Sequence, residues 1–328
     1  MTAPLLRAGA VVIGRNEGER LRACLASIVP QVRAVVYVDS GSTDGSTELA
    51  RAMGAEAIEL DLTLPFTAAR ARNAGCARLR ALHPDLALVQ LVDGDCEVRP
   101  TWLEQGAAWL DARPDAAAVC GRRRERYPEA SVYNLLCDIE WNTPIGDTRA
   151  CGGDALMRLD ALEQVGGYRD ELIAGEEPEL CVRLRAQGWH VWRVDVEMTL
   201  HDAAMTRFGQ WWRRAVRTGF AFAEGAWLHG AAPERHWVRE ALSALAWGAA
   251  LPLLIVGAAV FISPMCLAAV AAYPIQMLRI YLHSRGPRRA RLWRAVFLVV
   301  GKFAEALGEA KFLIRAWSGG PRRLIEYK

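Results

Sequence analysis

Two runs of apolar residues end in acidic side chains. Residues 35–38 lead into Asp39, and residues 88–92 lead into Asp93 and Asp95, which flank one glycine. A short apolar run that stops at a polar turn is typical of a buried parallel strand, whose last side chains lie at the carboxyl edge of the sheet. Paired carboxylates at such an edge can hold a hard divalent cation against a phosphate group. The spacing therefore predicts a metal and phosphate site at this edge.

The elements that must position these acids alternate between strands and helices. We expect strands at residues 8–13, 35–39, 55–60 and 86–92, and helices at 19–29, from a start at 42–45, at 67–82 and at 101–113. This alternation predicts an α/β fold with a mostly parallel sheet flanked by helices on both faces. Beyond it we expect a strand at 117–121, a loop with a short helix at 127–148, a strand at 155–158, a helix at 178–187, two short strands at 190–194 and 197–201, and a long helix at 207–228.

A long uncharged segment follows this region. Residues 241–278 contain no Asp, Glu, Lys, Arg or His, and one membrane span needs about 20 residues. We therefore expect a helical hairpin at about 242–282 that breaks at Ser263 and Pro264, with arginines before and after it that keep both ends cytoplasmic. The alternative is a buried pair of core helices. Residues 292–317 carry Lys302, Glu305, Glu309 and Lys311 in a largely apolar context, which predicts an amphipathic helix at the membrane surface.

Charge and cysteine content restrict the partners and the compartment. The chain has a formal charge of +3, but residues 279–328 carry twelve Lys and Arg against three Asp and Glu. This basic tail adjoins the apolar hairpin and lacks interleaved aromatic residues on a soluble face, which favours membrane lipids over nucleic acid. The eight cysteines show no CxxC pair and no metal-ligand spacing, so we expect reduced, buried thiols in a cytosolic domain. The N-terminus has no signal-peptide pattern.

Five short motifs in one order resemble the family 2 glycosyltransferases. They are VIGRNE at 12–17, VDSGSTDGS at 38–46, ARNAG at 71–75, DGD at 93–95 and GEEPEL at 175–180. The resemblance covers about residues 9–230. It implies a GT-A fold at 1–230, followed by a membrane-associated region at 231–328, a nucleoside-diphosphate sugar as donor, and Mg²⁺ or Mn²⁺ as cofactor. These motifs together are more specific than any of them alone.

The resemblance also implies roles for the acids of the site. It places Asp39 at the nucleotide base and Glu17 near the ribose. Asp95 is expected to ligate the metal directly, with Asp93 at the ribose or in the metal shell, because a divalent metal can neutralise a leaving diphosphate. His201 is expected to complete the metal shell, since neutral imidazole suits manganese. The alternatives are a solvated acidic turn and a structural histidine.

Further residues are expected to meet the substrates. Glu177, together with Glu176, stands where the family has Glu-Asp, so Glu177 takes the role of catalytic base; the alternative is a helix N-terminus enriched in acids. Arg72 is expected at the base or diphosphate, unless it is a solvated helix arginine. Asp154 follows a glycine pair and is expected at a donor hydroxyl.

A last motif lies in the long helix. Gln210 and Arg213 resemble the Gln-x-x-Arg-Trp motif of processive synthases and are expected near the diphosphate, although Arg214 stands in place of the tryptophan. The alternative is a helix at a bilayer surface, where Trp and Arg are enriched.

Together these features predict an inverting glycosyltransferase at the cytoplasmic face of the membrane, acting on a glycan or a lipid-linked acceptor. A sugar nucleotidyltransferase is the rival enzyme, but residues 14–18 lack the Lys- or Arg-bearing glycine loop that would hold a triphosphate. A membrane scaffold that keeps the fold without activity is the other alternative.

Overall fold

The computed structural model describes residues 5–319. The chain divides into two compact units, which we describe separately. The first consists of Met1–Tyr127 and Glu140–Ala203, and the second of Pro128–Ile139 and Ala204–Lys328. The last nine residues of the basic tail lie outside the described residues.

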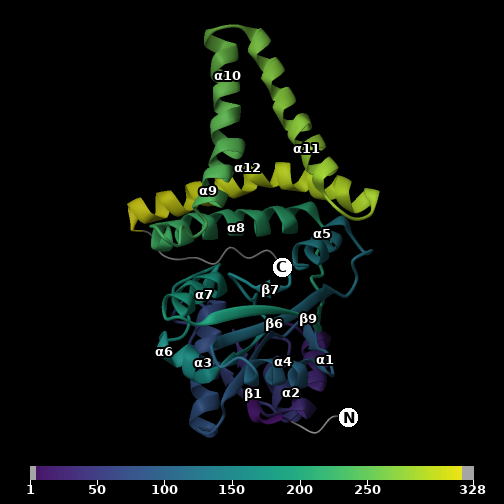
Figure 1. Cartoon of the computed structure of the whole chain (residues 1–328), viewed down its shortest axis with the longest axis vertical. Coiled ribbons are helices and arrows are strands. Elements are labelled where there is room, and N and C mark those ends of the chain that lie inside the picture. Colours follow the sequence, from purple (N-terminus) through teal and green to yellow (C-terminus); the bar gives the residue numbers. More distant parts are fainter. Residues whose placement is uncertain (1–4, 320–328) are drawn as a thin grey trace. The chain divides into compact units, whose positions relative to one another are not determined.

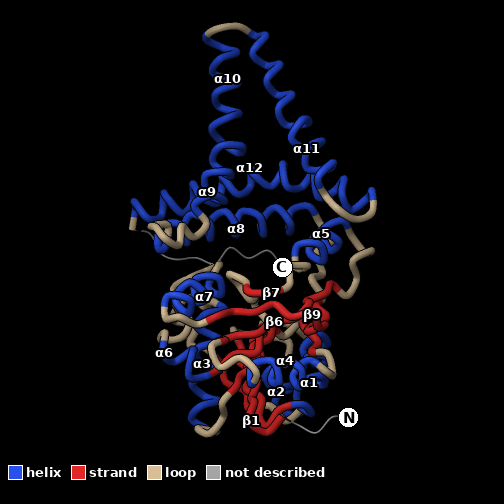
Figure 2. The backbone as a smooth tube through the Cα atoms, viewed as in Figure 1, coloured by secondary structure: helices blue, strands red, loops and turns tan. Residues whose placement is uncertain are grey.

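The first unit is built around a nine-stranded sheet, and its layers can be followed in Figures 1 and 2. Its strands are β1 (Leu5–Gly14), β2 (Val32–Asp39), β3 (Glu56–Glu59), β4 (Leu88–Asp93), β5 (Cys96–Val98), β6 (Ala116–Glu125), β7 (Gly146–Asp147), β8 (Ala155–Arg158) and β9 (His190–His201). Its helices are α1 (Glu19–Ile28), α2 (Ser46–Ala52), α3 (Ala68–Leu82), α4 (Trp102–Asp111), α6 (Leu159–Gln164) and α7 (Glu176–Ala186), with a 3₁₀ turn, η1 (Val29–Gln31).

The parallel half of the sheet contains the point where the strand order reverses. The order is β3-β2-β1-β4-β8-β6-β9-β5, so β1 lies between β2 and β4 and runs parallel to both. The chain moves outward from β1 to β3 and then returns through α3 to β4. Right-handed crossovers therefore place α3 on the opposite face of the sheet from α1 and α2, as Figure 1 shows. Ligands of open α/β sheets bind at the carboxyl ends of strands next to such a reversal.

Close packing fixes α3 against this part of the sheet. A Cβ added at Gly75 would lie 2.3 Å from Val11 Cγ1 and 3.0 Å from Val38 Cγ2. Only a glycine allows the helix backbone to come this near to β1 and β2. The side chain of Thr67 caps the helix by accepting a hydrogen bond from the Arg70 amide, so the start of α3 is held close to the strand ends.

The second half of the sheet differs from the expectation in two ways. β5, β7 and β8 pair antiparallel with their neighbours, so the sheet is mixed. The two strands expected at 190–194 and 197–201 form the single strand β9. The prediction of a break was wrong because β9 pairs with β6 on both sides of an irregularity near Arg122, which absorbs the change in register.

The second unit is helical in its described part. Its helices are α8 (Phe208–His229), α9 (Val238–Leu245), α10 (Leu251–Phe261), α11 (Ala272–His283) and α12 (Arg288–Ser318), together with most of α5 (Val132–Glu140) and the short segments η2 (Ala246–Ala250) and η3 (Pro264–Ala271). α8 and α12 run side by side (Figure 1). They cross closely, since a Cβ at Gly219 would lie 2.0 Å from the Glu305 carbonyl oxygen.

Two helical segments of the second unit are long and apolar enough to cross a membrane. They run over Val238–Phe261 and Pro264–His283, and most of their side chains are not covered by the protein. They form a hairpin that turns at Ser263, as the uncharged segment predicted (Figure 1). Length and composition alone are weak evidence for a span, because a core helix can satisfy both. Low burial distinguishes these helices from such a core pair.

Candidate functional site

The strand pairing brings the predicted acids of the first unit to one edge of the sheet. Gly14 at the end of β1 pairs with Asp39 at the end of β2, and Ile13 pairs with Asp93 at the end of β4. Asp39 and Asp93 are thus separated by one intervening strand, or roughly 10 Å. Carboxylates from separate segments thus lie at one carboxyl edge of the sheet, beside the reversal of strand order.

Asp39 is held rigidly at the end of β2. Its Oδ2 accepts hydrogen bonds from the backbone N–H groups of Gly41 and Ser42, at 2.8 and 2.7 Å, and its Oδ1 accepts one from the Tyr37 hydroxyl at 2.9 Å. Burial and the Asp39 charge raise the pKa of Tyr37, so the phenol remains a hydrogen-bond donor. A carboxylate has about four lone-pair sites, so Asp39 can accept one further donor from a ligand.

Glu17 lies in the loop after β1, next to the acidic turn of β4. A Cβ added at Gly94 would lie 3.4 Å from Glu17 Cγ, and the Gly94 amide donates to the Ile13 carbonyl at 2.8 Å. The Glu17 carboxylate pairs with Arg20 at 2.8 Å. Glycine at position 94 therefore lets the ends of β1 and β4 approach each other and places Glu17 beside the two aspartates.

Two arginines pair with Asp93, of which Arg72 is buried and Arg123 is partly buried. Arg72 Nη2 on α3 donates to Asp93 Oδ1 at 2.9 Å, and Arg123 Nη2 on β6 donates to Asp93 Oδ2 at 3.1 Å. Burial lowers the pKa of Arg72, but Asp93 and Glu176 raise it by more, and for Arg123 the nearby acids likewise outweigh burial. Both guanidiniums are therefore charged. The solvated-helix alternative for Arg72 is excluded, because its side chain is only 3% exposed.

Glu176 and Asp154 extend the same network. Glu176 Oε1 accepts from Arg72 Nη1 at 2.7 Å, which links the start of α7 to the end of β4. Asp154 Oδ1 accepts from the Asp93 amide at 3.1 Å and its Oδ2 accepts from the Thr199 hydroxyl at 2.8 Å. Asp154 is buried. These bonds hold Glu176 and Asp154 in place. Asp93 is in turn held by contacts from α3, from β6 and from the residue just before β8.

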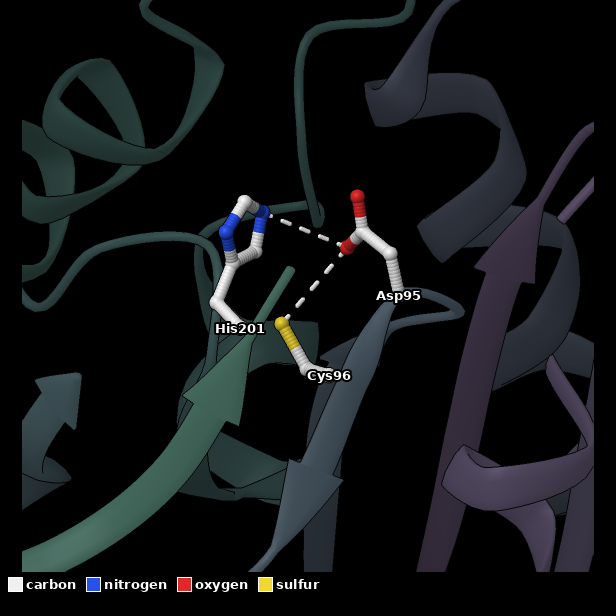
Figure 3. A group of neighbouring side chains, drawn as sticks. All are labelled: Asp95, Cys96 and His201. Atoms are coloured by element: carbon white, nitrogen blue, oxygen red, sulfur yellow. Dashed lines mark hydrogen bonds and ion pairs between the residues drawn. The ribbon is translucent and has the colours of Figure 1, made fainter. Parts of the chain in front are cut away.

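Asp95 and His201 form the group best suited to a hard metal ion (Figure 3). His201 Nε2 lies 3.3 Å from Asp95 Oδ1, and the Cys96 thiol lies 3.6 Å from the same oxygen. These three donors lie within 4.8 Å of one another. Antiparallel pairing of β5 with β9, in which Cys96 is opposite His201, brings them together.

The imidazole of His201 is in the form that a ligand requires. Burial, and then the charge of Arg123, lower the pKa of His201, although Glu125 opposes this. Its Nδ1 lies 3.6 Å from Glu125 Oε2, beyond normal hydrogen-bond length. A neutral imidazole and a carboxylate are donors that suit Mn²⁺. The residues present therefore fit a divalent metal, with Asp95 and His201 as ligands, whereas Asp93 is already engaged by arginines.

Glu177 lies in a separate buried group on the other side of Glu176. Its Oε1 accepts from the Cys151 amide at 2.5 Å and from the Cys181 thiol at 3.0 Å, and the two sulfur atoms are 3.8 Å apart. The neighbouring thiol of Cys181 and burial raise the pKa of Cys151. The two glutamates at the start of α7 thus point to different partners, Glu176 to Arg72 and Glu177 to thiols.

Gln210 and Arg213 lie in the second unit, on α8. Gln210 Oε1 accepts from the amides of Thr206 and Arg207, both at 3.0 Å, so this side chain caps the N-terminus of α8. Arg213 is exposed.

Several residues of the site were missed by the sequence argument. Arg123 lies in a strand that was expected to stop at residue 121 but extends to Glu125. Trp141 packs against His201, with ring centroids 4.6 Å apart, and carries the Arg123 guanidinium over its ring at 4.9 Å. The available signal was the run of three arginines at 122–124, which is unusual after an apolar strand.

Comparisons with known proteins agree with this geometry. Residues 10–165 match the model of the family "Glycosyl transferase family 2". Glycosyltransferase AglE of Haloferax volcanii is 24% identical over 67% of this chain and 74% of its own length. Succinoglycan biosynthesis protein ExoA of Rhizobium meliloti is 26% identical over 55% of this chain, and the match spans 58% of ExoA.

A solved structure shares the fold across nearly the whole chain. The mannosyltransferase PcManGT from Pyrobaculum calidifontis, in complex with GDP-Man and Mn²⁺, matches with a TM-score of 0.65 and 22% identity, over 94% of this chain and 87% of that one. This likeness establishes the GT-A fold, and the family match covers the strands that carry Asp39, Asp93 and Asp95. The chain therefore carries a glycosyl transferase family 2 domain at residues 10–165.

Proposed function

We propose that this protein transfers a sugar from a nucleoside diphosphate to an acceptor hydroxyl, with inversion at the anomeric carbon and with a divalent metal ion as cofactor. The observation that carries the proposal is the group of acids at the carboxyl edges of β1, β2 and β4, next to Arg72 and Arg123. Carboxylates for a cation and guanidiniums for phosphate are the groups that a nucleotide sugar needs.

The nucleoside would lie against β1 and β2. Asp39 is fixed by two amides and one phenol, so its remaining lone pair is preorganised to accept an N–H of the base. Glu17 is near enough to the same edge to accept a ribose hydroxyl. In this role both residues contribute binding and orientation of the donor rather than chemistry.

The diphosphate would lie near Asp95 and His201, whose donor atoms suit Mn²⁺ or Mg²⁺. A bound metal supplies charge neutralisation for the leaving diphosphate. PcManGT was solved with Mn²⁺ and GDP-Man, which supports the same cofactor class here. Arg72 and Arg123 contribute further positive charge, and Asp154 is placed to accept a donor hydroxyl. Gln210 and Arg213 would also contact the diphosphate, as their motif predicts.

A carboxylate at the start of α7 would accept the proton of the acceptor hydroxyl. Glu177 has this role by its place in the motif at residues 175–180. The acceptor oxygen forms its bond to the anomeric carbon as the bond to the diphosphate breaks, and the proton passes to the carboxylate. One displacement of this kind inverts the configuration.

We further propose that the acceptor is lipid-linked or amphipathic and is used at the cytoplasmic face of the membrane. The support is the pair of apolar helices Val238–Phe261 and Pro264–His283, which lie outside the family domain. Basic residues before and after the hairpin, such as Arg239 and Arg285, would lie on the cytoplasmic side.

The test uses the full-length protein in detergent or vesicles with a panel of UDP-, GDP- and dTDP-sugars and Mn²⁺. We expect release of a nucleoside diphosphate from one donor class, and loss of at least about 100-fold in kcat in Asp95→Asn, because several kcal/mol of charge stabilisation disappear. The matched control is Asp61→Asn, an exposed acid bonded only locally to Thr63.

Two outcomes would refute the proposal. Release of pyrophosphate from a nucleoside triphosphate and a sugar phosphate would identify a nucleotidyltransferase. Absence of both reaction and binding with every donor would favour a membrane scaffold without enzymatic activity. Equal activity on water-soluble and lipid-linked acceptors would refute the acceptor proposal alone.

A further inference from the structure

Glu177 differs from Asp93 and Glu179 in the partners of its charge. Asp93 pairs with Arg72 and Arg123, and Glu179 pairs with Arg169 and Arg183. In residues 5–319 no Lys, Arg or His side chain lies within 4.0 Å of the Glu177 carboxylate, which is only 5% exposed. A buried carboxylate without a cation is costly, so this position favours a bound cation.

The neighbours of Glu177 are two thiols at metal-binding distances. The sulfur atoms of Cys151 and Cys181 are 3.8 Å apart. Two thiolates on one tetrahedral zinc ion, each about 2.3 Å from it, are separated by about 3.8 Å. The two thiols and one Glu177 oxygen all lie within 4.8 Å of one another. The distance between the two sulfur atoms therefore equals the distance expected when both bind one zinc ion.

The backbone supports this arrangement from two directions. Glu177 and Cys181 are four residues apart on α7, so their side chains lie on the same face in successive turns. Cys151 comes from the loop before β8, and its backbone N–H already holds the Glu177 carboxylate. A third buried thiol, Cys120 on β6, interacts electrostatically with Glu177, Cys151 and Cys181.

We propose that Glu177, Cys151 and Cys181 form a buried site for a thiophilic divalent cation such as zinc. This site is distinct from the Asp95 and His201 group, whose ligands suit a harder ion. Binding releases the thiol protons to solvent. Its consequence for catalysis rests on the proposed function, because a cation on Glu177 occupies the lone pair that the acceptor proton would take.

The test is a titration of the metal-free full-length protein with Co²⁺, which reports ligand type through its absorption spectrum. We expect a thiolate-to-cobalt charge-transfer band and the intense visible bands of a tetrahedral site, saturating at one equivalent and displaced by Zn²⁺. Cys151→Ser and Cys181→Ser should each abolish the thiolate band, and Glu177→Gln should weaken Co²⁺ binding by about 10-fold or more.

The control is Cys96→Ser, which removes the thiol from the Asp95 group and should leave the band unchanged. Absence of a thiolate band in the wild-type protein would overturn the proposal, and this result needs no variant to fold. Persistence of the band in folded Cys151→Ser and Cys181→Ser, or its loss in Cys96→Ser, would also overturn it. Because the readout is spectroscopic, its outcome is independent of whether sugar transfer occurs.

Discussion

Replacement of Arg72 by methionine tests whether the arginine network holds the acidic edge together. Arg72 is 3% exposed and joins Asp93 to Glu176 at 2.9 and 2.7 Å. Loss of one partner of a buried ion pair costs about 3–5 kcal/mol. Asp93 keeps Arg123 as a partner, and the Glu176 side chain is 12% exposed. We therefore expect the lower end, about 3 kcal/mol, or about 6–12 °C in the unfolding temperature of a unit of this size.

The measurement should follow the first unit alone. Hydrogen exchange of the slowest amides in β1 and β4 gives the free energy of opening of this unit. A double-mutant cycle with Glu176→Gln isolates the contact, because glutamine no longer leaves a buried charge when Arg72 is absent. We expect the double variant to be more stable than the sum of the single losses by about 1–2 kcal/mol.

The control is an exposed ion pair of the same chemistry in the same unit. Arg78 and Glu56 have side chains about two-fifths exposed, so Arg78→Met should cost at most about 1 kcal/mol. An equal loss in Arg72→Met and Arg78→Met would refute the reasoning. So would additivity of Arg72→Met and Glu176→Gln, since additivity means that the two side chains do not interact.

Two further predictions concern the second unit. Burial, followed by the charge of Glu305, raises the pKa of Glu309 from 4.5 to about 8; the folded protein therefore binds the extra proton between these values and loses stability as pH rises through them. Glu309→Gln should remove this loss, so its advantage in unfolding temperature should grow across that window, and a constant difference would contradict the assignment. Gly219→Ala places a methyl group 2.0 Å from the Glu305 carbonyl oxygen and should cost about 1–3 kcal/mol. Gly257→Ala, with no described atom within 4 Å of the new methyl group, should cost nothing; equal effects in thermal unfolding would argue against a close crossing of α8 and α12.

The sequence was sufficient for features that depend on local pattern. Apolar runs ending at Asp39 and Asp93 indicated buried strands, and their regular alternation with helices implied parallel pairing. Parallel strands end at the same edge, so the common location of these acids follows from the sequence pattern. The hairpin was equally local, because its length and lack of charge are readable from consecutive residues.

The tertiary structure alone decided which side chains meet. His201 reaches Asp95 because β5 pairs antiparallel with β9, and Arg123 reaches Asp93 because β6 continues beyond its apolar part. Cys151 is thirty residues from Cys181, so no local spacing indicated that its thiol lies beside Cys181 and Glu177. Strand register and the packing of α7 set these contacts, and both depend on interactions summed over the whole unit rather than on any short segment.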